Sequence, residues 1–302
     1  MFVVGEGAHL HLCGGVSGNT GIRLTLTGTN ASAGRRSELI ITNKPWISSN
    51  QIRASEGTVT SDGDYGDVVF AVQSNSFLRL GGQNFNSQSM TFWNTANIRC
   101  KVDWAFDKSD MPLYIGNNSY LDMEGTSQRI GGLYLRHSGG RVVYITNSVA
   151  RAATLYINQT EEANWKQMGT VSGNINLVMD GTKAMGVTND WTAVGNVTLR
   201  GGGINFSDTG SWRGATNIVV SGASTHLSIA AANTLHKKAA LSLDGGALVT
   251  IAAGVTQRVG SLFVNGVERG NGRYTAASAP DVVSGDGELW VRGQAGTTII
   301  MR

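Results

Sequence analysis

One short phrase recurs nine times between residues 113 and 291 and constrains the fold more than any other feature. Each copy, here called an aliphatic triplet, has an aliphatic residue, any residue, and then an aliphatic residue or methionine. The copies begin at Leu113, Leu133, Leu155, Leu177, Val197, Ile218, Leu241, Leu262 and Leu289. They are spaced by 20 to 23 residues, apart from a last interval of 27. Strand-like segments at such a period predict a coil of stacked turns.

Strand geometry indicates what the triplets do. Successive side chains of a strand point to opposite faces, so the first and third residues of each triplet share a face. If that face points inward, the copies stack as two aliphatic columns, which bury surface that a single turn would expose. Second strands beginning at Ile204, Leu227 and Leu248 follow at similar intervals. The sequence therefore predicts an all-β parallel β-helix, or β-solenoid, with turns of about 20–23 residues.

Glycine is abundant, with 41 residues against three prolines. A glycine stands two residues after the end of each of the last six triplets. This fixed position predicts sharp corners with positive φ. These corner glycines are Gly181, Gly201, Gly222, Gly245, Gly266 and Gly293. Residues 161–168 are the one segment for which we expect a short helix. About fourteen turns at ~4.8 Å each would give a rod of roughly 65 Å.

We expect one domain over residues 1–302, with less regular turns in 1–112, regular turns in 113–293 and a tail in 294–302. The net charge is +3, and basic residues adjoin only at 35–36 and 237–238. Without a basic stripe, nucleic-acid binding is not expected. No apolar run approaches the ~18 residues of a membrane span.

Cysteine usage and the N-terminus bear on the compartment. Cys13 and Cys100 lie about four turns apart, too far for a disulfide in a straight coil, so we expect free thiols. Few cysteines favour bacterial export over a disulfide-rich ectodomain. The first residues lack the pattern of a signal peptide, and a strand begins almost at once without a cap. We therefore expect a piece of a longer exported protein.

The C-terminal part resembles a known family. Residues 241–267 read LSLDGGALVTIAAGVTQRVGSLFVNGV, and GNGRYT and VSGDGELWV follow at 270–275 and 283–291. This stretch is similar to the autotransporter-associated β-strand repeat, with its ending of the form aGtY … sGtGtLtV, and the likeness covers residues 197–293. The resemblance implies a right-handed parallel β-helix exported to the surface of a Gram-negative type of bacterium, without catalysis.

Three tyrosines form the candidate ligand site. Tyr114, Tyr134 and Tyr156 hold the outward middle position of three successive triplets. Stacked aromatic rings on an exposed sheet can bind sugar rings, so surface glycans or a matrix polysaccharide are the expected partners. The alternative is a ladder of rings that only stabilises neighbouring strands.

Two clusters resemble metal sites but lack a full ligand set, so no metal or other cofactor is expected. His9, His11 and Cys13 share one face of a strand without a fourth ligand. Aspartates crowd a glycine-rich loop without the calcium-binding loop pattern, and a solvated turn explains them. These aspartates are Asp62, Asp64 and Asp67.

An enzyme is the alternative from another class. Parallel β-helices also host polysaccharide lyases and hydrolases, and hydrolysis of a glycoside needs two carboxyl groups about 5–9.5 Å apart. Asp103, Asp107, Asp110 and His137 are the candidates. The signatures of polygalacturonases are missing, so no catalytic residue is assigned. We expect a non-catalytic extracellular rod that presents loops for adhesion; the alternatives are a carbohydrate-active enzyme and a glycan-binding module.

Overall fold

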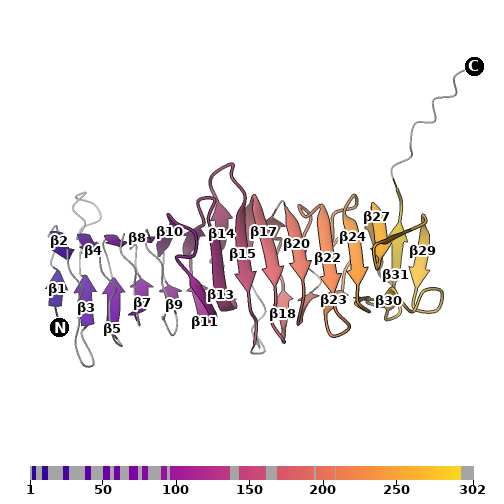
Figure 1. Cartoon of the computed structure of the whole chain (residues 1–302), viewed down its shortest axis with the longest axis horizontal. Helices are drawn as coiled ribbons and strands as arrows, with labels where there is room; N and C mark the ends of the chain where they lie inside the picture. The colour runs from indigo at the N-terminus through magenta and orange to yellow at the C-terminus, as the bar shows by residue number, and fades with distance from the viewer. Residues whose placement is uncertain are drawn as a thin grey trace, which may run out of the picture.

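The protein is a β-solenoid whose strands stack along one long axis (Figure 1). The computed structural model describes residues 96–136, 143–160, 169–193, 195–207 and 209–293, and nine strands between residues 2 and 93. Within these residues every regular element is a strand. The predicted all-β solenoid is thereby confirmed.

The largest sheet runs along most of the rod in Figure 1, from the N-terminal end to β27. Its fourteen strands are all parallel except the last, β28, which is antiparallel to its neighbour. In spatial order they are β1 (Phe2–Val4), β3 (Arg23–Leu26), β5 (Asn50–Ala54), β7 (Val68–Gln73), β9 (Met90–Trp93), β11 (Asp107–Gly116), β13 (Ser127–Arg136), β15 (Ala153–Ile157), β17 (Ile175–Met179), β20 (Asn196–Leu199), β22 (Asn217–Ser221), β24 (Ala240–Asp244), β27 (Ser261–Val264) and β28 (Val267–Arg269).

A second sheet of nine parallel strands covers the N-terminal half and ends near residue 193. It contains β2 (His9–Leu12), β4 (Glu38–Ile41), β6 (Thr58–Ser61), β8 (Phe77–Leu80), β10 (Asn97–Cys100), β12 (Tyr120–Asp122), β14 (Tyr144–Asn147), β16 (Thr170–Gly173) and β19 (Thr192–Ala193). Each turn in this half therefore contributes one strand to each of two sheets.

Two further sheets replace the second one in the C-terminal half. The five-stranded sheet contains β18 (Ala184–Val187), β21 (Gly203–Phe206), β23 (His226–Ile229), β25 (Leu248–Ile251) and β30 (Val283–Ser284). The three-stranded sheet has the order β26 (Thr256–Val259), β31 (Glu288–Val291) and β29 (Gly272–Thr275), with β29 antiparallel to β31. The second strands predicted from Ile204, Leu227 and Leu248 are β21, β23 and β25.

The aliphatic columns are confirmed over most of the regular region. Leu177 lies beside Val197, and Val197 beside Ile218, in adjacent strands of the largest sheet. Leu241 and Leu262 continue the same column. All five side chains are buried. Because each turn alone would expose its aliphatic face, this stacking is what buries the core.

One predicted neighbour in the column is wrong. Leu155 pairs with Gln128, and not with Leu133. The cause is the length of β13: β15 pairs only with its first four residues, whereas β11 pairs with Arg129 and Ile130 and also with residues 132–136. β11 also contains a register shift between Lys108 and Pro112. A triplet spacing cannot tell which half of a ten-residue strand the next turn will use.

The last triplet is also misplaced by the prediction. Leu289 pairs with Gln257 in the three-stranded sheet, and does not lie beside Leu262. The interval of 27 residues before it reflects an insertion that folds as antiparallel β28 and β29. The final turn therefore moves its aliphatic triplet to another face of the rod.

Glycine is required at these corners for two different physical reasons. Gly222, Gly245 and Gly266 have φ of 100°, 61° and 75°, as predicted for sharp corners. Gly181, Gly201 and Gly293 do not have positive φ, so the prediction is wrong for these three. At Gly181 the reason for glycine is a close contact. A Cβ there would lie 2.1 Å from the carbonyl oxygen of Gln159, so only glycine permits this approach of two turns.

Candidate functional site

The predicted tyrosines lie on the outer face of β11, β13 and β15, but they do not form one column. The Tyr114 and Tyr134 rings stack with centroids 4.6 Å apart and planes at 15°. Tyr134 is only 9% exposed, and Gln159 Nε2 donates to its hydroxyl oxygen at 3.4 Å. Tyr134 therefore offers little ring surface to a ligand, and the stacked pair acts as a ladder between two strands.

Tyr156 belongs to a different cluster because β15 pairs with the first half of β13. Its ring centroid lies 5.5 Å from that of Trp104. The Arg129 guanidinium lies 5.1 Å from the Trp104 centroid and 5.9 Å from the Tyr156 centroid, within the range of cation–π attraction. We call Trp104, Arg129 and Tyr156 the aromatic platform. Both rings are half-buried, and Arg129 is exposed.

The backbone of Trp104 is strained. Its φ is 64°, a conformation that is an outlier for a bulky residue. Its amide donates to the Ser127 carbonyl at 2.7 Å, which holds the loop against the start of β13. Such strain costs roughly 1–3 kcal/mol and concentrates at binding and catalytic positions. Sequence reasoning missed Trp104, since nothing in its spacing predicts a left-handed residue.

The candidate acidic residues support β13. An Asp103 carboxylate oxygen accepts the Ser127 amide at 2.7 Å, and Asp107 forms an ion pair with Arg129 at 3.2 Å. Asp110 is exposed. His137 lies outside the described residues. Asp103 and Asp107 thus both hold the segment that carries Arg129.

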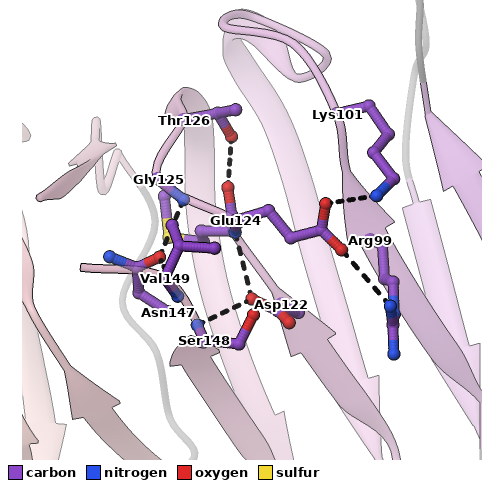
Figure 2. A network of polar contacts seen from close by, with 10 residues as sticks. Arg99, Lys101, Asp122, Glu124, Gly125, Thr126, Asn147, Ser148 and Val149 are labelled. Atoms are coloured by element: carbon purple, nitrogen blue, oxygen red, sulfur yellow. Dashed lines mark hydrogen bonds and ion pairs between the residues drawn. The ribbon is translucent and has the colours of Figure 1, made fainter. Parts of the chain in front are cut away.

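A polar corner at β10, β12 and β14 was not predicted (Figure 2). Glu124, with φ of 43°, forms ion pairs with Arg99 at 3.5 Å and Lys101 at 2.5 Å. Beside it, one oxygen of the buried Asp122 accepts the amides of Glu124 at 3.0 Å and Ser148 at 3.1 Å. The two carboxylates of this corner therefore form ion pairs with cations of an adjacent turn and accept hydrogen bonds from main-chain amides.

Asn147 completes the polar corner from the next turn. Its Oδ1 accepts the Gly125 amide at 2.7 Å, and its Nδ2 donates to the carbonyls of Arg151 at 2.6 Å and Asn174 at 2.9 Å. One buried side chain thus satisfies main-chain groups of three turns. The corner thus holds adjacent turns of the stack in order.

The candidate metal ligands fall largely outside the described side chains. His9 and His11 lie in β2, of which the backbone is described, whereas Cys13 lies outside the described residues. Asp62, Asp64 and Asp67, and the segment 161–168 expected to be helical, also lie outside them. Among the residues that the structure describes, no three histidine, cysteine or acidic side chains gather as a metal site. Cys100 is free and buried.

A cavity of about 590 Å³ lies near the C-terminal end of the rod. Aliphatic side chains of β24, β25 and β27 and the exposed Val267 line it. Arg269 and Asp281, also in its lining, form an ion pair at 2.6 Å. The charges of Arg269 and Asp281 thus balance each other within the lining.

Comparison with protein-family models, with curated proteins and with solved structures found no match for this chain. None of the described segments forms a helix that is long and apolar enough to cross a membrane. Functional inference therefore depends on the fold and on the side chains that it brings together.

Proposed function

We propose that this chain is a non-catalytic rod segment of an exported bacterial protein and that it binds glycans on the aromatic platform. The carrying observation is the Trp104–Tyr156 pair, half-buried and 5.5 Å apart on the outer face of the largest sheet. A strained φ of 64° brings the Trp104 indole to this pair. Aromatic rings next to a guanidinium offer a sugar both apolar contact and hydrogen-bond donors.

The rod itself supports display at a surface. One sheet runs through the stack, and from β17 to β27 the first and third residues of each triplet are buried at every turn. Weak contacts repeated along such a rod add up to firm attachment. The resemblance of residues 197–293 to autotransporter-associated repeats agrees with export. Asp103 and Asp107 hold the strand segment that carries Arg129, so they support the aromatic platform.

Affinity electrophoresis in gels containing neutral polysaccharides tests the proposal. Trp104→Ala and Tyr156→Ala should each abolish or strongly reduce retardation, while circular dichroism confirms that the variants are folded. Tyr144→Ala is the matched control, because Tyr144 is 38% exposed on the second sheet. Tyr134→Ala should lower stability and leave binding largely intact.

Two results would overturn the proposal. If Tyr144→Ala reduces retardation as much as Trp104→Ala does, the polysaccharide does not bind on the aromatic platform. Release of new reducing ends from any polysaccharide by the wild-type chain would favour the enzyme instead, and Asp103→Asn and Asp107→Asn would then identify its carboxylates.

A further inference from the structure

The three-stranded sheet gathers cations that the sequence spreads over 35 residues. Arg258, Trp290 and Arg273 lie side by side, because Trp290 on the central strand β31 pairs with Arg258 on β26 and with Arg273 on β29. Arg292 follows two residues after Trp290 and so shares its face. The guanidinium groups of Arg258, Arg273 and Arg292 lie 4.3, 4.9 and 5.7 Å from the Trp290 ring centroid. We call these four residues the arginine face.

The charges of the arginine face are unbalanced. Glu288 is on the same face and bonds Arg273, and Thr256 Oγ1 donates to it at 2.7 Å. In the described part of the chain, Arg258 and Arg292 have no carboxylate partner. Three cations thus face one carboxylate, and all three arginines are exposed. Two guanidinium groups keep donors available for an anion.

The preceding turn adds positive charge. Leu235 bonds the side chain of Gln257, one residue before Arg258, which places Lys237 and Lys238 in the turn next to the arginine face. A Cβ on Gly260 would lie 2.8 Å from the Lys238 carbonyl oxygen, so the two turns are in contact here. Both lysines are exposed. Exposed cations therefore lie on two adjacent turns at this end of the rod.

Trp290 fixes the geometry of this surface. Arg258 and Arg273 approach its ring from the strands on either side, and cation–π attraction limits where their guanidinium planes can point. Planar guanidinium groups held in place match carboxylate and sulfate groups, which can accept two parallel hydrogen bonds. Less side-chain freedom is lost on binding when the donors are already ordered.

We propose that the arginine face binds a linear acidic polysaccharide through its carboxylate or sulfate groups. Repeated anions along a chain suit cations repeated along the rod. Proteins that bind single-stranded nucleic acid stack bases on open aromatic rings, whereas Trp290 already has a guanidinium from each neighbouring strand. This site is separate from the aromatic platform, so it stands or fails independently of the function proposed above.

Titration calorimetry with polygalacturonate, dextran sulfate and neutral dextran tests the proposal. The wild-type chain should bind one or both anionic polymers and not neutral dextran, and the preferred polymer distinguishes carboxylate from sulfate recognition. The double variant R258Q/R292Q should bind at least about tenfold more weakly, since it removes two charge-assisted contacts. Its dependence of affinity on salt should also become shallower, because fewer ions are released.

Arg269→Gln provides the matched control. Arg269 is an exposed arginine near the same end of the rod, but it is paired with Asp281 at 2.6 Å. Its loss should change affinity less than about twofold, because that charge is already balanced. Trp290→Leu should weaken binding while all arginines remain, because the guanidinium groups lose their support.

Three outcomes would overturn the proposal. If neither anionic polymer binds at low salt, the proposed site is excluded. Equal weakening by Arg269→Gln and R258Q/R292Q would show attraction to net charge alone. Tighter binding of a single-stranded oligonucleotide, lost in R258Q/R292Q, would make the surface a nucleic-acid site instead.

Discussion

The Gln257 side chain bonds both main-chain groups of Leu235, a residue of the preceding turn. The Leu235 amide donates to Gln257 Oε1 at 3.2 Å, and Gln257 Nε2 donates to the Leu235 carbonyl at 3.3 Å. β26, which contains Gln257, is an edge of its sheet and has no strand partner on that side. The side-chain amide of Gln257 thus makes the hydrogen bonds that a neighbouring strand would otherwise make with the Leu235 main chain. Gln128 does the same for the Phe106 amide at 2.7 Å.

Gln257→Leu should destabilise the protein, although it places an aliphatic residue beside Leu289. The substitution leaves the Leu235 amide and carbonyl buried without these partners, at about 1–3 kcal/mol for each group. Urea unfolding should show a lower midpoint with an unchanged slope. Ser242→Ala, on the outer face of β24, serves as the control and should change stability by less than about 0.5 kcal/mol.

Gly131→Ala should be among the most damaging small substitutions in the chain. A Cβ there would lie 2.2 Å from the Asp110 carbonyl carbon and 2.4 Å from the Met111 nitrogen, and the main chain cannot yield cheaply. We expect a loss of about 3 kcal/mol or more in the free energy of unfolding. Gly270→Ala is the control, because nothing lies within 4 Å of its added carbon. Similar unfolding midpoints for both variants would contradict the close approach of β11 and β13.

Asn147→Asp should destabilise the polar corner in a pH-dependent way. A carboxylate oxygen would face the Arg151 and Asn174 carbonyls in place of a donor, so the new carboxyl should titrate above its usual value of about 3.9. Because the folded pKa is raised, the loss of stability should be smallest below that value and grow as the pH rises through the folded pKa. Thermal unfolding from pH 3 to 7 measures it. Asn174→Asp, at an exposed side chain, should show a weaker trend.

Glu288 should contribute stability that acid removes. Hydrogen bonds from Thr256 and Arg273, with the charge of Arg273, hold the pKa of Glu288 below its usual 4.5. A lowered folded pKa means that the contribution is present above 4.5 and is lost as the pH falls through the folded value. Glu288→Gln should therefore lower the melting temperature at neutral pH and match the wild type in strong acid. Glu268→Gln, at an exposed residue of β28, should be neutral at every pH.

Cys100 should be unreactive while the protein is folded. Burial, together with the charges of Asp122 and Glu124, raises the pKa of its thiol far above the usual range. A thiolate is the reactive form, so thiol-specific reagents should modify Cys100 only after denaturation. The measurement uses a Cys13→Ser background, in which Cys100 is the remaining cysteine. Rapid modification of the native protein would contradict the buried position.

The solenoid could be predicted because its cause is periodic. Each turn must bury the same two positions, and the regular spacing of the aliphatic residues in the sequence reflects this requirement. The resulting neighbours include Leu177, Val197 and Ile218. The break at Leu155 was not predictable, because it depends on a β13 long enough to serve two partners. Buried Gln128 signals that break, as a polar residue in register with a leucine.

The candidate sites were predicted only in part, because they depend on register and on corners. Tyr114 and Tyr134 stack as expected, whereas Tyr156 joins Trp104, which lies in a loop without a periodic signal. The sequence did not predict the arginine face, because its cations lie far apart along the chain. They come together only where the antiparallel strand β29 lies beside β31. Glycan binding at the aromatic platform stays a prediction.

The second sheet stops near residue 193, while the largest sheet continues past it. The turn that contains β17, β18 and β19 has a strand in all three of the sheets that meet here, because β19 ends the second sheet and β18 begins the five-stranded sheet beside β21. Tension along the long axis would therefore be carried by two ladders on each side of this turn, so the rod should resist stretching at the changeover as well as it does elsewhere.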